Sequence, residues 1–405
     1  MNQILKAFAF LSTLQILSAT PSEILSYKSI PSRVRNSNIE LAAARFRIDE
    51  AVAMASQAGR LSNPSLDTGI DHNIQSAEGR IEIGLSQKFP ITNRLGLEKE
   101  IGLTEVKAAE AEVRNAERLL IAEARQEFVR VLSIRERKEL LKKQKQLAAD
   151  LAEFISGASV RGEISSLDAA QARLAALRIT TEERRLETEE TATLGRLRPI
   201  VGIAAGKPVS ISGSTPSLEL PALTQSDRPD LTAARIKLQA ANSGIALEQA
   251  RKQEDLEASV FAAGERIDDA PVGLRNEGII GIKLSIPFPF WDDNQGAIDA
   301  ATARRNRKEQ EINALSRDIQ HEVKTAFTEM QQWAALVSEL DKKLLPLAKE
   351  QTNFLETAYR NGQGDLQAVL ASREQTLELT ASKLDAIREF QLARIRYQAA
   401  NGSQF

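Results

Sequence analysis

The stretch IKLSIPFPFWDDNQGAI, from Ile282 to Ile298, joins a strand pattern to a helix pattern. In its first half, aliphatic residues alternate with Lys283 and Ser285, which is the period of a strand with one apolar face. Two prolines then end the pattern, because proline cannot donate a ladder hydrogen bond. Residues 292–294 are Asp-Asp-Asn, which cap helices well, and a helical period begins after them. The stretch therefore predicts a strand that leads into a long helix.

The elements around this stretch form one unit, which spans residues 230–401. A helix is expected first. Residues 256–289 contain two alternating runs joined by a short loop, which predicts a β-hairpin. Residues 292–399 hold a helical pattern that breaks at Gly362 and Gly364, which predicts a long helical hairpin.

The first half of the chain has the same plan over residues 36–198. It begins with a helix, a β-hairpin is predicted at 65–90, and a helical hairpin at 94–198 breaks near Gly162. The first long helix would extend roughly 90 Å, far more than a globular domain needs. In the second half, Pro346 is expected to bend the corresponding helix.

The two units are related by an offset of about 200 residues, which is the signature of a tandem duplication. Residues 199–229 between them are rich in Pro, Gly and Ser, and we interpret them as a linker. The matched positions are Leu85-Ser86 with Leu284-Ser285, Phe89-Pro90 with Phe288-Pro289, Phe128 with Phe327, Gly162 with Gly362, and Arg173 with Arg373.

Composition excludes several classes of function. The chain has 405 residues and a net charge of -2, so electrostatics give no reason to expect a nucleic-acid partner. It has no cysteine, which excludes a disulfide, a thiolate metal site and a lipid-anchored cysteine. Its two histidines, His72 and His321, are far apart in sequence. No phosphate-binding glycine loop, nucleophile with its base, or distinct carboxylate pair is found. We therefore expect no enzyme activity, cofactor or metal site.

The N-terminus has the pattern of a secretory signal peptide over residues 1–20. Lys6 precedes an apolar run, and small residues and a proline follow it. The run is too short to span a bilayer as a helix. The alternative is a buried N-terminal helix.

The four predicted strands can cross a membrane only if several chains contribute their strands to one barrel. Strands of about ten residues with one apolar face match the length that crosses a bilayer, although a soluble sheet gives the same pattern. Four strands cannot close a barrel around a pore, and an open edge cannot face lipid because its backbone groups would stay unsatisfied.

With its proline-rich strand end followed by NQG-x-I, the junction resembles that of TolC-like outer-membrane efflux channels, in particular the subgroup serving cobalt–zinc–cadmium-type RND pumps. The resemblance covers about residues 36–401. It implies a mainly α fold with membrane β-barrel strands, in which three chains form a twelve-stranded barrel that continues into a helical tunnel. It further implies an outer-membrane location extending into the periplasm, a periplasmic adaptor protein and an inner-membrane RND pump.

The resemblance also assigns a role to the two helical turns, which in the family are the periplasmic tips where the adaptor docks. Turn geometry alone explains the glycines equally well. The implied docking residues are Arg161, Gly162, Ser165, Leu167, Asp168, Arg360, Gly362, Gly364, Asp365 and Leu366.

Two features depart from the family. The lipid-anchored cysteine that many relatives carry is absent. Relatives often place aspartates one and two turns past the second tip glycine, where this chain has Ala368 and Ala371. Asp168 and Asp365 remain nearby, so an acidic ring that narrows the tunnel would have to be built differently.

The last strand predicts which side chains meet lipid, since alternate residues of a barrel strand face lipid and lumen. The lipid-facing residues would be Ile280, Ile282, Leu284 and Ile286, with Lys283 in the lumen.

The sequence thus favours a passive outer-membrane exit duct for heavy-metal cations in a tripartite efflux system. Two alternatives stay open. One is an exit duct for drugs or for type I secreted polypeptides, and the other is a soluble periplasmic coiled-coil scaffold.

Overall fold

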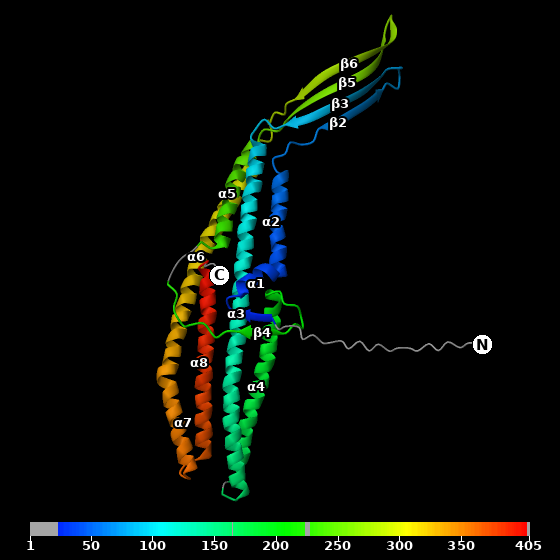
Figure 1. Cartoon of the computed structure of the whole chain (residues 1–405). Coiled ribbons are helices and arrows are strands. Elements are labelled where there is room, and N and C mark those ends of the chain that lie inside the picture. The colour runs from blue at the N-terminus through cyan, green and yellow to red at the C-terminus, as the bar shows by residue number, and fades with distance from the viewer. Residues whose placement is uncertain (1–22, 164, 223–226, 403–405) are drawn as a thin grey trace, which may run out of the picture.

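The computed structural model describes residues 23–163, 165–222 and 227–402. The expected signal peptide over residues 1–20 lies outside these residues. The chain forms a long rod of helices with a β-sheet at one end and two helical turns at the other (Figure 1).

The two halves of the chain contain equivalent elements. The first half has α2 (Ile39–Gln57), β2 (Ser65–His72), β3 (Gly79–Phe89), α3 (Arg94–Val160) and α4 (Ser166–Ile200). The second half has α5 (Pro229–Ala250), β5 (Leu256–Asp269), β6 (Gly273–Ser285), α6 (Gln295–Glu339), α7 (Leu345–Arg360) and α8 (Leu366–Ala400). The ends of α4 and α8 differ by 200 residues in number, the offset at which the sequence repeats.

The helix α6 joins α7 through one π-helical turn, η1, at Leu340–Leu344. At its end the backbone N–H of Leu345 donates to the carbonyl of Leu340, five residues earlier. Pro346 follows, and its ring would clash with a carbonyl four residues back in a regular α-helix. The wide turn therefore accommodates the proline within a continuous rod.

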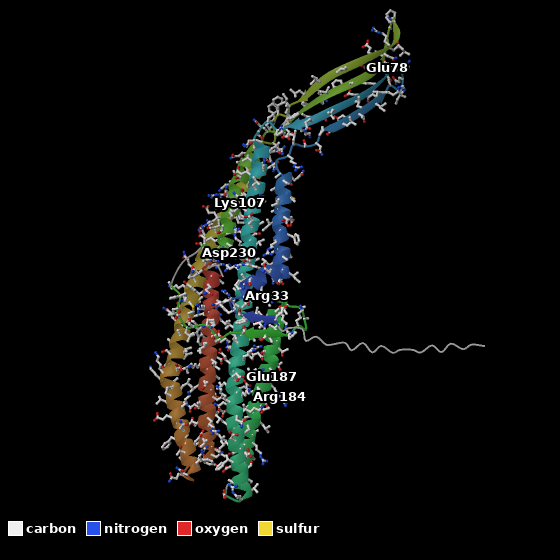
Figure 2. The ribbon with its side chains drawn as sticks, viewed as in Figure 1. Arg33, Glu78, Lys107, Arg184, Glu187 and Asp230 are labelled. Carbon is white, nitrogen blue, oxygen red and sulfur yellow. The ribbon has the colours of Figure 1, made fainter. Side chains whose placement is uncertain are left out.

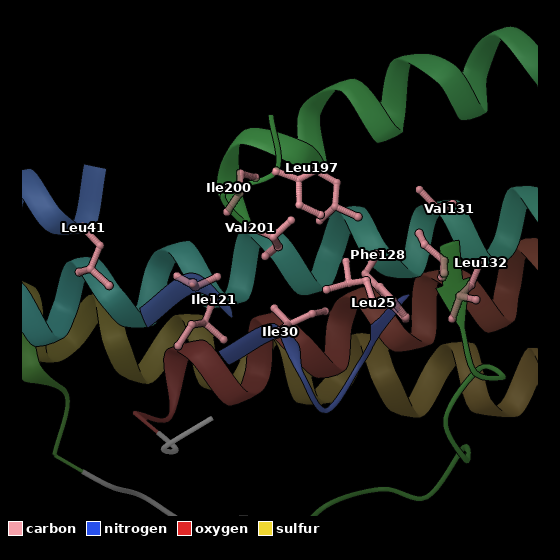
Figure 3. Close-up of a cluster of buried hydrophobic side chains, with 14 of the residues drawn as sticks. Leu25, Ile30, Leu41, Ile121, Phe128, Val131, Leu132, Leu197, Ile200 and Val201 are labelled. Atoms are coloured by element: carbon pink, nitrogen blue, oxygen red, sulfur yellow. The ribbon is translucent and has the colours of Figure 1, made fainter. Parts of the chain in front are cut away.

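A small sheet and a short helix wrap the middle of the rod. β1 (Glu23–Ser26) pairs in parallel with β4 (Val209–Ser212), and α1 (Ile30–Ser37) follows β1. Together with α2, α3 and α4 they enclose a buried apolar cluster, part of which Figure 3 shows. Its members include Leu25, Ile30, Val34, Leu41, Ile121, Phe128, Val131, Leu132, Leu197, Ile200, Val201 and Ile211.

The predicted linker at 199–229 contains secondary structure and buried residues. Its first two residues complete α4, and Val209–Ser212 is β4. Ile203 and Ile211 are buried, and Arg228 caps α5. Apolar burial explains the difference. The isolated aliphatic residues of this polar stretch become buried only because β4 pairs with β1, whose partner residues Glu23 and Val209 are far apart in sequence.

The larger sheet is antiparallel and has the strand order β2-β3-β5-β6. The central pair, β3 with β5, joins the two halves of the chain, and within the described residues β2 and β6 are its open edges. Below the sheet, the lower parts of the helices form a row in the order α6–α7, α8, α3 and α4 (Figure 1). The inner neighbours α3 and α8 pack through Ala122 and Val129 against Leu392 and Ile395.

No helix in the described ranges combines the length and the apolar character that a membrane crossing requires.

Candidate functional site

One face of the larger sheet is apolar across all four strands. The strand register aligns Leu66, Leu85, Val260 and Ile282 in one row. The next row on this face is Thr68, Ile83, Ala262 and Ile280. The side chains are exposed, with 80% of Ile282 and 85% of Ile280 accessible. Exposed apolar surfaces of this extent in one chain mark contact with lipid or with another protein.

The opposite face of the sheet is polar. Lys283, Ser259, Ser86 and Ser65 form the row next to that of Ile282 and lie on this face because side chains alternate along a strand. The four sequence-predicted lipid-facing residues, Ile280, Ile282, Leu284 and Ile286, are 48–85% exposed. The first three lie in β6, and Ile286 follows its end.

Phe261 is an aromatic residue on the polar face, with a glycine on each side. Its register partners are Gly84 on β3 and Gly281 on β6. A Cβ atom built on Gly281 would lie 2.5 Å from Cζ of Phe261, so the ring covers this glycine. The sequence does not predict this arrangement, because the glycine partners of Phe261 follow only from the strand register.

The far end of the sheet is held by Glu78, in the loop between β2 and β3 (Figure 2). Its carboxylate accepts hydrogen bonds from the Asn73 amide at 3.0 Å, the Ser76 hydroxyl at 2.8 Å and the backbone N–H of Asp268 at 3.2 Å. The last of these bonds ties the first hairpin to β5.

The near end of the sheet carries exposed aromatic residues. Phe288 and Phe290 have ring centroids 6.1 Å apart, and Phe290 and Trp291 are 6.3 Å apart. Trp291 is 98% exposed. Aromatic side chains of this kind are enriched where a membrane meets water. The sequence predicts this stretch as the junction between strand and helix, and the pattern assigns no role to its aromatic residues.

Both helical turns have the same hydrogen-bonded geometry. In the first, the N–H of Gly162 donates to Ser159 at 3.0 Å and the N–H of Glu163 to Ala158 at 2.9 Å. In the second, Gly362 donates to Tyr359 at 3.0 Å and Gln363 to Ala358 at 2.9 Å. This is the Schellman pattern, which requires a left-handed residue. Gly162 and Gly362 supply it with φ values of 76° and 73°.

The first turn is exposed and polar. The Ser165 side chain caps α4 by accepting from the N–H of Leu167 at 3.1 Å. Arg161 pairs with Glu163 at 2.9 Å, and this hydrogen bond lowers the pKa of the Glu163 carboxyl. Leu167 is 63% exposed. This turn presents a small polar and apolar surface to solvent.

The second turn differs from the first because one of its leucines is buried. Leu366 is only 1% exposed and packs in a cluster with Ile155, Ala152, Ala169 and Ala172 of the first helical hairpin. Leu366 therefore holds the two turns together rather than facing outward.

The remaining second-turn residues lie around this contact. Arg360 and Asp365 are exposed, and Asp365 caps α8 without a side-chain hydrogen bond. Gly364 is required, because a Cβ atom there would lie 2.8 Å from the backbone nitrogen of Tyr359. Burial raises the pKa of the Tyr359 phenol, and the charges of Asp168 and Asp365 raise it further.

A groove of about 660 Å³ lies above the turns, between the first helical hairpin and α8. Its apolar lining includes Leu141, Leu151, Leu174, Leu370 and Leu377. Arg373 bridges three helices beside it, with Glu356 of α7 at 2.6 Å and the Leu147 carbonyl of α3 at 3.2 Å. The repeat matches Arg173 with Arg373, but the groove beside Arg373 arises only where the helices pack, so no sequence pattern predicts it.

The structure was searched for side chains that could bind a metal ion together. Across the described parts of the chain, no three or more His, Cys, Asp or Glu side chains are grouped so that they could hold a metal ion. Ala368 and Ala371 occupy the first turns of α8.

Comparisons with known proteins agree with this geometry. The profile of the family described as outer membrane efflux protein matches residues 30–202 and 220–403. The cobalt-zinc-cadmium resistance protein CzcC of Cupriavidus metallidurans is 25% identical over 395 residues, covering 94% of this chain and 87% of CzcC.

Solved structures show the same fold. The channel CusC matches with a TM-score of 0.75 and 17% identity, covering 93% of this chain and 92% of its own. The outer membrane protein VceC of Vibrio cholerae matches with a TM-score of 0.75 and 18% identity, covering 93% and 96%. With both of its halves matched by the family profile, the chain belongs to the outer membrane efflux protein family.

Proposed function

We propose that this protein is the outer-membrane channel of a tripartite efflux system, a passive exit duct for substrates delivered by an inner-membrane RND pump through a periplasmic adaptor. The observation that carries the proposal is the apolar face of the four-stranded sheet, which stays exposed at the end of a long helical rod. Lipid would cover this face, while the polar face with Lys283 would line water. Membership in a family of efflux proteins also agrees with the expectation that the chain is not an enzyme.

The open edges of the sheet support assembly from several copies. Unpaired N–H and C=O groups on β2 and β6 would cost several kcal/mol each in hydrocarbon, so a membrane sheet must close. The described residues of one chain contribute four strands to this sheet. The resemblance implies three copies, which would give a closed barrel of twelve strands with the helices continuing as a tunnel into the periplasm.

The helical turns are the proposed adaptor contact. They lie at the end of the rod farthest from the sheet (Figure 1). The exposed residues there, Arg161, Ser165, Leu167, Arg360 and Asp365, can contact a partner directly. Leu366 would contribute indirectly, by fixing how the two turns are placed.

The proposed substrates are heavy-metal cations, because CzcC is named as a cobalt-zinc-cadmium resistance protein. Drugs and secreted polypeptides are the alternative cargo. Deleting the gene and measuring growth on cobalt, zinc and cadmium salts beside a panel of drugs separates these cases. Sensitivity to drugs alone would overturn the metal assignment and leave the duct in place.

The membrane assignment is tested with spin labels on single cysteines in this cysteine-free chain. A label at position 282 should be reached by a lipid-soluble quencher and a label at 283 by a water-soluble one. Equal exposure to water at both positions would contradict the barrel and favour the soluble scaffold. As a second arm, Ile282→Arg should impair assembly, since a lipid-facing charge costs roughly 2–4 kcal/mol per chain, whereas Lys283→Gln should assemble normally.

A further inference from the structure

We propose that the far end of the apolar sheet face carries a binding site for the phosphate group of a membrane lipid, formed by His72, Gly79, Arg266 and Asn276. The lipid is the phosphorylated glycolipid that fills the outer leaflet of a bacterial outer membrane. This proposal rests on the membrane channel proposed above and adds to it a lipid class and the side chains that bind it.

The four residues form one row across the sheet, with one residue from each strand. His72 on β2 lies opposite Gly79 on β3. Gly79 in turn lies opposite Arg266 on β5, and Arg266 lies opposite Asn276 on β6. The row is two positions beyond the apolar row that contains Ile70, so its side chains project from the same apolar face.

The side chains of this row are hydrogen-bond donors that suit a phosphate. His72, Arg266 and Asn276 are all exposed. A guanidinium group binds phosphate oxygens through two parallel N–H donors, and an amide and an imidazole each add a donor. Arg266 and Asn276 are cross-strand partners, whose Cβ atoms lie about 4.5–5.5 Å apart, so both can reach one phosphate.

Gly79 leaves a notch in the middle of the row. A Cβ atom built there would lie 3.6 Å from Nδ1 of His72, so the imidazole borders the space that the glycine leaves free. Neighbouring strands are about 4.8 Å apart, which places the backbones of His72 and Arg266 about 10 Å from each other across this notch. A glycine within a strand lets a ligand approach the backbone closely.

The charge of the row is not neutralised on its own face. The nearest carboxylates, those of Asp71, Glu265 and Glu277, belong to the opposite face because side chains alternate along a strand. Asp268 lies on the same face, one row farther out. Within the described residues, the Arg266 side chain forms no ion pair with it or with any other carboxylate. An anion supplied from outside the chain would complete the row.

The depth of the row matches the border of a membrane. From Phe89 to Gly79, β3 extends about 34 Å, and a barrel tilt of about 40° reduces this to a height of about 26 Å. The apolar band of an outer-membrane barrel is about 25 Å tall. If Phe89 lies at one border, the row with Arg266 lies at the other, where lipid phosphates are found.

The two borders differ in charge. At the near end, the last paired rows of the apolar face are Gln87 with Ala258 and Phe89 with Leu256, which contain no cation. The row with Arg266 lies at the end of the sheet away from the helices, near Glu78 (Figures 1 and 2). In the proposed channel the helices extend into the periplasm, so this end lies in the outer leaflet. Lipopolysaccharide, whose lipid A carries phosphate groups, fills that leaflet.

Binding of lipid A to the full-length protein in detergent, counted by native mass spectrometry, tests the site. Arg266→Gln should weaken the binding of bisphosphorylated lipid A about tenfold, because a charged, two-pronged phosphate contact is lost. Arg275→Gln is the matched control, since it removes the same charge near the same end from the opposite face, and it should bind like the parent. Position 266 is exposed, so the melting temperature in lipid-free detergent should not change.

The phosphate itself is tested with two further probes. Lipid A stripped of its phosphates should bind the parent and Arg266→Gln equally weakly. Inorganic phosphate that binds as tightly as lipid A would identify a site for free anions and overturn the lipid assignment. Equal binding of bisphosphorylated lipid A by the parent and Arg266→Gln, or an equal loss in Arg275→Gln, would overturn the site.

A spin label at position 282 separates the failure of this site from the failure of the channel. A label that meets lipid, in a protein whose lipid A binding does not depend on Arg266, would overturn the site and leave the channel standing. A label that meets water, in a protein absent from outer membranes, would overturn the channel and the site with it.

Discussion

At the scale of single residues, the contact of Phe261 with Gly281 sets how far an aromatic ring projects from the polar face of the sheet. A side chain at position 281 would meet the tip of the ring, which can move away from the sheet but not into it. Glycine therefore lets a large residue lie flat on a surface that is proposed to line water.

Gly281→Ala should push the Phe261 ring toward the lumen and lower the single-channel conductance in planar bilayers. The protein should still assemble, because the obstructing atom is the far end of a side chain. Gly69→Ala is the matched control, since it lies on the same face and a Cβ atom there meets nothing within 4 Å. Restored conductance in Gly281→Ala/Phe261→Ala would identify the ring as the cause, and an unchanged conductance in Gly281→Ala would contradict this role.

At the scale of the elements, the two helical turns have matching backbones but unequal burial. Position 366 is a buried leucine that joins the hairpins, whereas its repeat counterpart is Ser166, which is exposed. Leu167, one residue further, is the exposed leucine of the first turn.

Leu366→Ala should loosen the contact between the two hairpins. Removing a buried leucine side chain costs about 2–5 kcal/mol, while exposed substitutions usually change stability by at most about 0.5 kcal/mol. Hydrogen exchange should therefore accelerate in residues 151–172 and 359–370 for Leu366→Ala and stay near the parent value for Leu167→Ala. Equal exchange in both variants would show that Leu366 does not hold the turns together.

The main helices and strands could be predicted because glycine and proline mark where they end. Strands of about ten residues alternate long enough to be recognised, and Gly162 and Gly362 mark turns that need a positive φ. The four-residue strands β1 and β4 are too short to show a period, and their pairing depends on distant sequence. The burial of Leu366 could not be predicted either, because repeat symmetry suggests equal roles for the two turns.

At the scale of the whole molecule, a charged cluster joins the two halves where α3, α5, α6 and α8 come together. Arg228 contacts Asp230 at 2.6 Å and also pairs with Glu322. Arg118 donates to the Ala399 carbonyl near the end of α8. The middle of the rod therefore depends on ion pairs as well as on the apolar core.

Acid should weaken this junction. Burial alone would raise the pKa of Asp230, but hydrogen bonding and charge from Arg228 and Arg118 outweigh it, and the pKa lies below its ordinary value of 3.8. The stabilisation is thus complete above pH 3.8 and is lost as the pH falls through the lower folded-state pKa. Unfolding followed by circular dichroism should show a smaller acid-dependent loss of stability in Asp230→Asn than in the exposed control Asp227→Asn. Identical pH profiles would exclude Asp230 as the titrating group.

The unpaired strands β2 and β6 also constrain how the protein is made. If the protein reaches the outer membrane as proposed, each new chain would cross water with two unpaired strand edges and an exposed apolar sheet face. Unpaired edges of this kind template pairing with other chains and promote aggregation. Assembly of identical chains would then compete with aggregation, and the outcome would depend on the concentration of chains and on chaperones. In the proposed channel, the unpaired edges through which identical copies would join also make the single chain the form most prone to aggregate.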